Sequence, residues 1–162
     1  ATHRGDGVSC STRKNEPRRA PLSPQRRMTV VDASVAAKWF LPGEPLASEA
    51  RAVLYEIRDD PRGFLVPELF LNELLAVLAR MHGVTAVDVA EAISLVEALG
   101  LHRVANGHEL LASAAELAVD WGLSGYDATY VALARLAGGA WLTADRRAAN
   151  RVRDRKLVRI LG

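Results

Sequence analysis

The feature that most constrains this chain is a regular alternation of short apolar segments with longer amphipathic ones. Runs of β-branched and large apolar residues predict strands over 28–31, 64–66, 101–104, 140–143 and 157–160. The longer segments between them predict helices over 34–41, 46–58, 67–81, 86–99, 108–121, 125–137 and 145–153. Pro67 is expected at the first position of its helix. Because such alternation is typical of parallel sheets covered on both faces, we expect a three-layer α/β/α fold with a central parallel sheet of four or five strands.

Residues 1–27 differ in composition from the rest of the chain. They contain seven Lys and Arg against two Asp and Glu, and few large apolar residues. Such a segment buries too little surface to offset the entropy of ordering, so we expect a disordered basic leader or an extension upstream of a start at Met28. A basic arm that contacts RNA phosphates is the functional alternative. Residues 28–162 carry a net charge of −3 and suit a single domain.

Composition excludes several classes of protein. Hydrophobic residues make up 49% and charged residues 25%, which is typical of soluble domains. No apolar run approaches the roughly 18–20 residues of a membrane span, so we expect no membrane association. Cys10 is the single cysteine, which excludes an internal disulfide and makes a cysteine-based zinc site implausible. These features favour a cytoplasmic location.

Two acidic residues lie on helix faces where apolar residues are expected. Glu73 shares one face of its predicted helix with apolar residues three and four positions away on either side. Asp127 has apolar residues at the corresponding positions after it, and it lies in the first turn of its helix, where the macrodipole favours negative charge. A carboxylate on an apolar face costs free energy unless it is paired or binds a metal.

Two further acids follow predicted strands. Asp32 directly follows the first strand, and Asp145 follows the 140–143 strand by two residues. Ligands of open α/β sheets bind at the carboxyl ends of the strands, so all four acids can meet at one edge. No Lys or Arg lies at helical or adjacent spacing to Asp32, Glu73 or Asp127, and unpaired acids would repel one another. Mg²⁺ or Mn²⁺ would relieve this repulsion and support phosphodiester hydrolysis.

Each acid also has a purely structural interpretation. Asp32 and Asp145 are suited to cap the N-termini of the helices that follow them. Asp127 is suited to compensate its helix dipole. Glu73 is able to pair with a distant arginine. It is the joint pattern of four acids that favours a metal site.

Several segments resemble those of a known family, and they occur in its order. They are Val30-Val31-Asp32-Ala33-Ser34-Val35 with Lys38-Trp39-Phe40, then Pro67 six residues before Glu73, then Ser124 to Ala134, and then Leu142-Thr143-Ala144-Asp145-Arg146-Arg147. From Met28 onward the chain resembles a PIN domain, and specifically the VapC-type toxins of bacterial toxin–antitoxin pairs.

The resemblance implies a type II toxin, a Mg²⁺-dependent endoribonuclease that cleaves single-stranded RNA, with Mn²⁺ able to substitute. It implies an acidic site of Asp32, Glu73, Asp127 and Asp145, in which Asp32, Asp127 and Asp145 hold the metal and Glu73 orients the attacking water. It also implies a homodimer and a cognate antitoxin that forms a hetero-oligomer with the toxin. We expect the helices 46–58 and 86–99 to offer the antitoxin an apolar groove, although they would also serve simply to cover the sheet.

One position departs from the family, and a few hydroxyls are expected to support the site. Many relatives have Asn three residues after the helix glutamate, where this chain has Ala76, which would alter the orientation of Glu73. Thr143, and with it Ser34, is expected to support the acids through its hydroxyl.

Other side chains near the acids have two interpretations each. Arg146 and Arg147 are expected to bind an RNA phosphate or an antitoxin carboxylate, or else to lie on a solvated helix face. Lys38 is expected to contact substrate or to remain exposed. Tyr126 is expected to stack on a base or, more simply, to pack in the core, and all three tryptophans are interpreted as packing residues.

Two other functions remain open at this point. A non-catalytic PIN-like module would bind RNA or protein without cleaving it, and the complete acid set argues against that. A phosphatase of the haloacid dehalogenase type would use Asp32 as a nucleophile. Such phosphatases usually have a second Asp two residues later, where this chain has Ser34.

Overall fold

The computed structural model describes residues 27–41 and 43–162. The predicted leader, apart from Arg27, lies outside the described residues. No helix in the described part of the chain combines the length and apolar character needed to cross a membrane.

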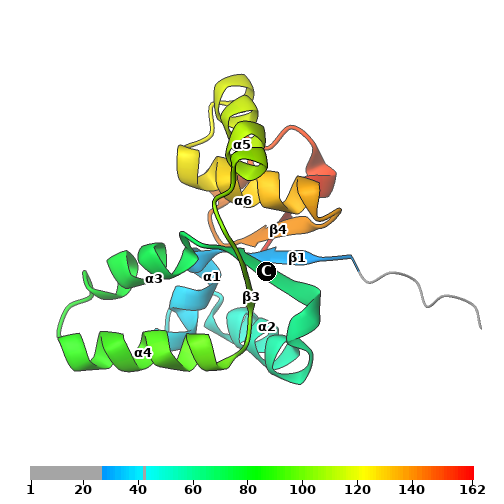
Figure 1. Ribbon diagram of the computed structural model, residues 1–162. Helices are drawn as coiled ribbons and strands as arrows, with labels where there is room; N and C mark the ends of the chain where they lie inside the picture. Colours follow the sequence, from blue (N-terminus) through cyan, green and yellow to red (C-terminus); the bar gives the residue numbers. More distant parts are fainter. Residues whose placement is uncertain (1–26, 42) are drawn as a thin grey trace, which may run out of the picture.

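A five-stranded parallel sheet forms the centre of the molecule, as the sequence predicts (Figure 1). The strands are β1 (Thr29–Val31), β2 (Phe64–Pro67), β3 (His102–Val104), β4 (Ala140–Thr143) and β5 (Val158–Ile160). Their spatial order is β3-β2-β1-β4-β5, and every adjacent pair is parallel. β1 therefore lies at the centre with β4 beside it, and Val30 is in register with Trp141. The carboxyl ends of all five strands share one edge, which we call the carboxyl edge.

Helices cover both faces of this sheet, which confirms the three-layer fold. The helices are α1 (Ala33–Ala37), α2 (Ala47–Asp59), α3 (Phe70–Leu78), α4 (Ala86–Ala98), α5 (His108–Trp121), α6 (Gly125–Leu136) and α7 (Arg146–Ala149). Three 3-10 turns accompany them: η1 (Lys38–Phe40), η2 (Pro61–Gly63) and η3 (Arg155–Leu157). Figure 1 shows α5 and α6 above the sheet and α1 to α4 below it. The core between the layers includes Val30, Tyr130 and Trp141, which are almost fully buried.

The start of α3 corrects the prediction for Pro67. Pro67 is the last residue of β2, opposite Val104 of β3, and does not open a helix. The backbone N–H of Glu68 donates to the Val104 carbonyl at 2.9 Å, so strand pairing continues one residue past the proline. The helix consequently begins only at Phe70, and the predicted 67–81 helix is shortened at both ends.

The predicted helices 34–41 and 145–153 are also shorter than expected. The first divides into α1 and η1, and the second is only α7. After α7 the backbone N–H of Val152 bonds the carbonyl of Ala149, three residues back, in a tightening turn. The side chain of Asp154 then accepts from the backbone N–H of Lys156 and starts η3. A local side-chain cap therefore competes with continuation of the helix.

Gly139 allows β1 and β4 to pair closely at the start of the ladder. The backbone N–H of Ala140 donates to the Met28 carbonyl at 3.0 Å. A Cβ atom on Gly139 would collide with that same carbonyl oxygen and with the Cβ of Met28. The close approach of these two segments, rather than a positive φ, is why a glycine is needed here.

Candidate acidic site

Asp32 lies at the carboxyl end of the central strand and is only 8% exposed. Its Oδ1 accepts the backbone N–H of Ser34 at 2.7 Å, so it caps α1 as the structural interpretation predicts. Its Oδ2 accepts the indole Nε1–H of Trp141 at 2.8 Å. Burial raises the pKa of Asp32, the hydrogen bonds from Ser34 and Trp141 oppose the increase, and the negative charge of Asp127 adds to it. Asp32 is therefore both a helix cap and one member of a group of acids.

Glu73 projects from α3 toward Asp32 and Asp127, and it pairs with a tyrosine instead of an arginine. The Tyr130 hydroxyl donates to Glu73 Oε2 at 2.6 Å. Burial raises the pKa of Glu73, the Tyr130 hydrogen bond lowers it, and the charges of Asp32 and Asp127 raise it further. Burial together with the Asp32 and Glu73 charges also raises the pKa of Tyr130 far above its ordinary value, so Tyr130 remains a neutral hydrogen-bond donor.

The face of α3 that carries Glu73 is not the apolar stripe that the sequence predicted. The buried face of α3 consists of Phe70, Leu74 and Leu78. Glu73 is half-buried beside this face, and Ala76 and Val77 are exposed. Glu73 thus borders the core, from which its carboxylate reaches the carboxyl edge.

Asp127 is held in the first turn of α6 by a reciprocal pair of hydrogen bonds. The Ser124 hydroxyl donates to Asp127 Oδ2 at 2.7 Å and accepts from the Asp127 backbone N–H at 3.0 Å. Its charge acts on both Asp32 and Glu73. Three acids that are widely separated in sequence therefore interact electrostatically at the carboxyl edge.

Asp145 stands apart from these three acids. It is exposed, and its Oδ1 caps α7 by accepting the backbone N–H groups of Arg147 at 2.8 Å and Ala148 at 3.0 Å. Its charge is not among those that raise the pKa of Asp32 or Glu73. The structure therefore brings together three of the four predicted acids and leaves Asp145 at the end of the neighbouring strand.

Two hydroxyls connect Asp145 to the strand that carries Asp32. The Thr143 hydroxyl accepts the Asp145 backbone N–H at 3.0 Å and lies 3.4 Å from the Ser34 hydroxyl. The Ser34 hydroxyl accepts the backbone N–H of Ala144 at 3.0 Å. Thr143 is completely buried. These contacts fix the ends of β1 and β4 relative to each other.

The chemistry of the acids suits a hard divalent cation. Within residues 27–41 and 43–162, no group of three or more His, Cys, Asp or Glu side chains forms a closed metal-binding cluster. Asp32, Glu73 and Asp127 nevertheless repel one another, and no ion pair in that part of the chain involves them. Carboxylate oxygens are the ligands that Mg²⁺ prefers, and Mg²⁺ usually retains several waters, so an open site fits it.

Trp141 and Tyr130 are the functional contacts that the sequence analysis did not identify. Trp141 was expected only to pack, yet its indole N–H is bonded to Asp32. A signal was available, because a buried tryptophan N–H needs an acceptor and Trp141 lies on a predicted strand beside the Asp32 strand. Tyr130 lies three residues after Asp127, on the same side of α6.

The remaining predicted residues have mixed outcomes. Lys38 forms an ion pair with Glu44 at 3.6 Å, and its side chain is 16% exposed, so its interpretation as an exposed lysine is wrong. Tyr126 is 64% exposed, so its predicted core packing is also wrong. Arg146 and Arg147 are exposed next to Asp145.

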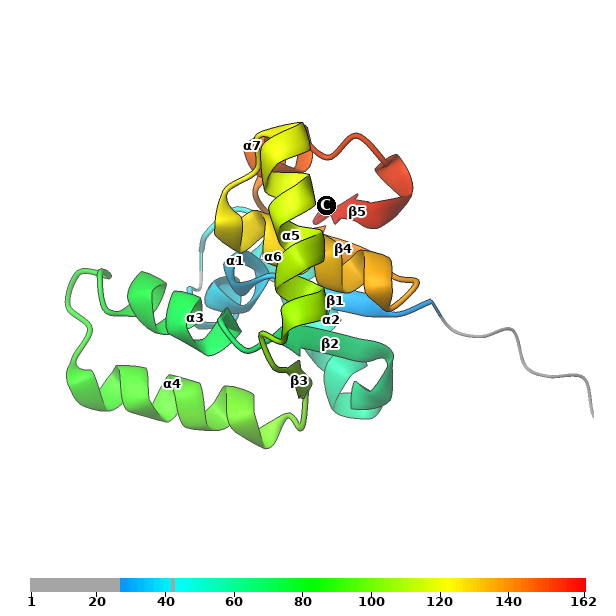
Figure 2. The ribbon, with the colours of Figure 1, turned by 45° about the horizontal axis from the view of Figure 1, so that its top comes forward.

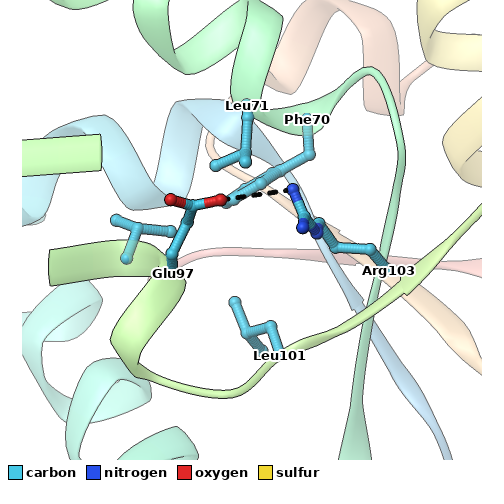
Figure 3. Close-up of a pocket in the computed structure, with 6 residues that line it drawn as sticks. Phe70, Leu71, Glu97, Leu101 and Arg103 are labelled. Carbon is cyan, nitrogen blue, oxygen red and sulfur yellow. Dashed lines mark ion pairs between the residues drawn. The ribbon is translucent and has the colours of Figure 1, made fainter. Parts of the chain in front are cut away.

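A small cavity of about 120 Å³ lies away from the acids, between α3, the end of α4 and β3. Figure 3 shows the ion pair between Glu97 and Arg103, 3.4 Å apart, across this cavity, with Phe70, Leu71 and Leu101 around it. None of the four acids lines it. Its size and its internal ion pair make it unsuitable for a polynucleotide, so the acids at the carboxyl edge remain the candidate site.

Comparisons with known proteins agree with this fold. No curated protein matches the chain. Among solved structures, PAE2754 from Pyrobaculum aerophilum is 20% identical, with a TM-score of 0.60 over 85% of this chain and 91% of that one. Mycobacterium tuberculosis VapC20, described as a Sarcin-Ricin loop cleaving toxin, is 20% identical with a TM-score of 0.61 over 75% of this chain and 93% of that one. FitAcB from Neisseria gonorrhoeae is 16% identical, with a TM-score of 0.60 over 83% and 97%.

At these identities the solved structures support the fold, and family membership comes from the sequence itself. The pattern of the PIN domain matches residues 29–154, which include every strand except β5 and all four acids. PIN domains are typically metal-dependent nucleases. The chain belongs to the PIN domain family.

Proposed function

We propose that this chain is the toxin of a type II toxin–antitoxin system and cleaves single-stranded RNA in a Mg²⁺-dependent endonucleolytic reaction. The observation that carries the proposal is the group of three acids at the carboxyl edge, whose charges raise the pKa of Asp32 and Glu73 and have no cationic partner within the described ranges. A tRNA, an rRNA or an mRNA is the substrate.

Each acid has a proposed role. Asp32, Asp127 and Asp145 hold the metal, which when bound activates water and stabilises charge on the phosphoryl group. Glu73 orients the attacking water through Oε1, while Tyr130 fixes the other oxygen of the same carboxylate. Asp145 is able to contribute because its second carboxyl oxygen accepts no hydrogen bond from the described residues. Trp141, Ser34 and Thr143 keep the strand ends in place.

The proposed antitoxin site is an apolar groove of about 420 Å³ between η1, α2 and α4. It is lined by Trp39, Phe40, Leu54, Tyr55, Arg58, Leu95, Val96 and Leu99. An amphipathic helix of an antitoxin would bury its apolar face there. This proposal is supported by the likeness to a Klebsiella pneumoniae toxin–antitoxin complex, which is 15% identical with a TM-score of 0.59. A homodimer is the proposed state of the free toxin, and its mass in light scattering tests this.

The decisive experiment is cleavage of a mixed single-stranded RNA with Mg²⁺, Mn²⁺ or EDTA. We expect the wild-type chain to cut with either metal and not with EDTA. Asp127→Asn should abolish cutting, whereas Asp120→Asn, which neutralises an exposed acid on α5, should leave it unchanged. RNA binding by the folded wild type without cleavage under either metal would support the alternative of a non-catalytic binding module instead.

A further inference from the structure

The C-terminal part of the chain contains an unusual density of positive charge. Between residues 146 and 159 there are seven Arg and Lys and a single acid, Asp154, although residues 28–162 as a whole are net negative. We call these cations the basic segment: Arg146, Arg147, Arg151, Arg153, Arg155, Lys156 and Arg159. All seven are exposed, whereas the apolar residues between them are buried or half-buried.

The charge of the basic segment is not neutralised within the described residues. Each ion pair found there involves other side chains. Two of the guanidinium groups are instead fixed by backbone oxygens: Arg151 donates to the Gly122 carbonyl at 2.9 Å, and Arg155 donates to the Ala149 carbonyl at 3.0 Å. Carbonyl acceptors orient a guanidinium without cancelling its charge, so these cations are available to an anionic ligand.

The basic segment begins at the acidic site and extends away from it. α7 starts directly after Asp145, and Arg151 contacts the turn before α6, whose first turn holds Asp127. Lys156 is at the opposite edge of the sheet, where its carbonyl accepts from Arg27, two residues before β1. Figure 2 shows this part of the chain leaving α7 and running along the outer side of the sheet into β5.

From this placement we propose that the basic segment binds the phosphates of the RNA strand beside the cleavage site. The inference rests on the proposed nuclease function and adds where the strand lies. A ligand with regularly spaced negative charges matches it, because phosphate contacts require only exposed cations. A protein partner would require an apolar interface core, and Ala148, Ala149, Val152 and Leu157 of this segment are all buried.

The test measures binding of a mixed-sequence single-stranded RNA to the full chain in EDTA at 50 to 200 mM salt. We expect the triple variant R151Q/R153Q/K156Q to lose about 0.7 per lost contact, or roughly 2 in total, from the slope of log affinity against log salt. The affinity advantage of the wild type should therefore shrink roughly tenfold or more across this salt range.

Two matched variants complete the design. R51Q/R58Q/R62Q removes the same charge from α2 and η2 and should keep the wild-type slope, while R151K/R153K retains the charge and should also keep it. Equal slopes for the wild type and the triple variant would overturn the inference, as would an equal loss in the α2–η2 control. So would unchanged RNA binding together with lost affinity for an oligoglutamate peptide, which would indicate a protein ligand.

This experiment separates the inference from the proposed nuclease. Because binding is measured in EDTA, a chain that binds RNA through the basic segment but never cuts it would support the inference and overturn the nuclease. Circular dichroism melts of each variant confirm that the comparison is between folded proteins.

Discussion

At the scale of single residues, the molecule maintains two buried acids whose ionisation is unfavourable. Burial is the main reason that the pKa values of Asp32 and Glu73 are raised, and their mutual charges add to it. A carboxyl group whose folded pKa exceeds its unfolded value contributes stability that is fully present below the unfolded pKa and is lost as pH rises through the folded pKa. The free, metal-less protein should therefore gain stability from Glu73 as the pH falls from 7 toward 4.5.

We expect Glu73→Gln to remove this pH dependence. Without divalent metal at pH 7, the variant should be more stable than the wild type by roughly 1 kcal/mol or less, since the side chain is partly solvated. Urea unfolding from pH 4 to 8 measures the difference, with the exposed Glu91→Gln as the control. If the wild type and Glu73→Gln differ by the same amount at every pH, the raised pKa of Glu73 is wrong.

A second prediction concerns the indole N–H that supports Asp32. Trp141→Phe leaves the Asp32 Oδ2 without that donor, so the pKa of Asp32 should rise further and the fold should lose about 1–3 kcal/mol. Any pH–rate profile of RNA cleavage should shift to higher pH. Trp39→Phe is the matched control, because its indole N–H bonds the Ala50 carbonyl at 2.9 Å and involves no acid. An identical pH profile in both variants would assign Trp141 a packing role only.

The residues themselves were only partly predictable from sequence. Asp32, Glu73 and Asp127 were selected because unpaired acids follow a strand or lie on helices at the right spacing, and the structure places them together. Their hydrogen-bond donors were not predicted, since Trp141 is 109 positions from Asp32 and Tyr130 is 57 from Glu73. Local periodicity carries no information about such distant pairs.

At the scale of elements, sequence patterns identified each strand and α-helix but misplaced several ends. The prediction for Pro67 relied on its preference for the first turn of a helix, whereas pairing of β2 with β3 determines the actual boundary. The 145–153 helix was overextended because Asp154, a strong cap for η3, lies just beyond it. In both cases a contact outside the local window decides where the element ends.

The pairing of β1 with β4 gives a prediction for the element scale. Gly139→Ala introduces a Cβ against the backbone of Met28, so the two segments must separate at the start of the ladder. We expect a loss of about 1–3 kcal/mol in the free energy of unfolding, measured by urea denaturation. Gly125→Ala, where an added Cβ meets nothing, should cost far less. Equal stability of the two variants would show that the ladder adjusts without strain.

At the scale of the whole molecule, divalent metal should stabilise the fold by binding only the folded acids. At a concentration 100-fold above its dissociation constant, Mn²⁺ would add about 2.7 kcal/mol and raise the Tm by on the order of 5–10 °C. Differential scanning calorimetry of Asp127→Asn should show almost no increase, and Asp120→Asn should behave as the wild type. An unchanged Tm in the wild type would argue against a metal at this site, independently of any RNA substrate.

The sheet order has a consequence for the time at which the site comes into existence during synthesis. β1 is made first, yet its carboxyl end is completed by β4 and by Trp141, which leave the ribosome more than a hundred residues later. A chain ending at Gly139 carries Asp32, Glu73 and Asp127 but lacks the strand that pairs with β1 and the indole that bonds Asp32. We expect such a chain to show neither Mn²⁺ stabilisation nor RNA cleavage, so a nuclease built in this order remains harmless to the ribosome that is translating it until nearly the whole domain has emerged.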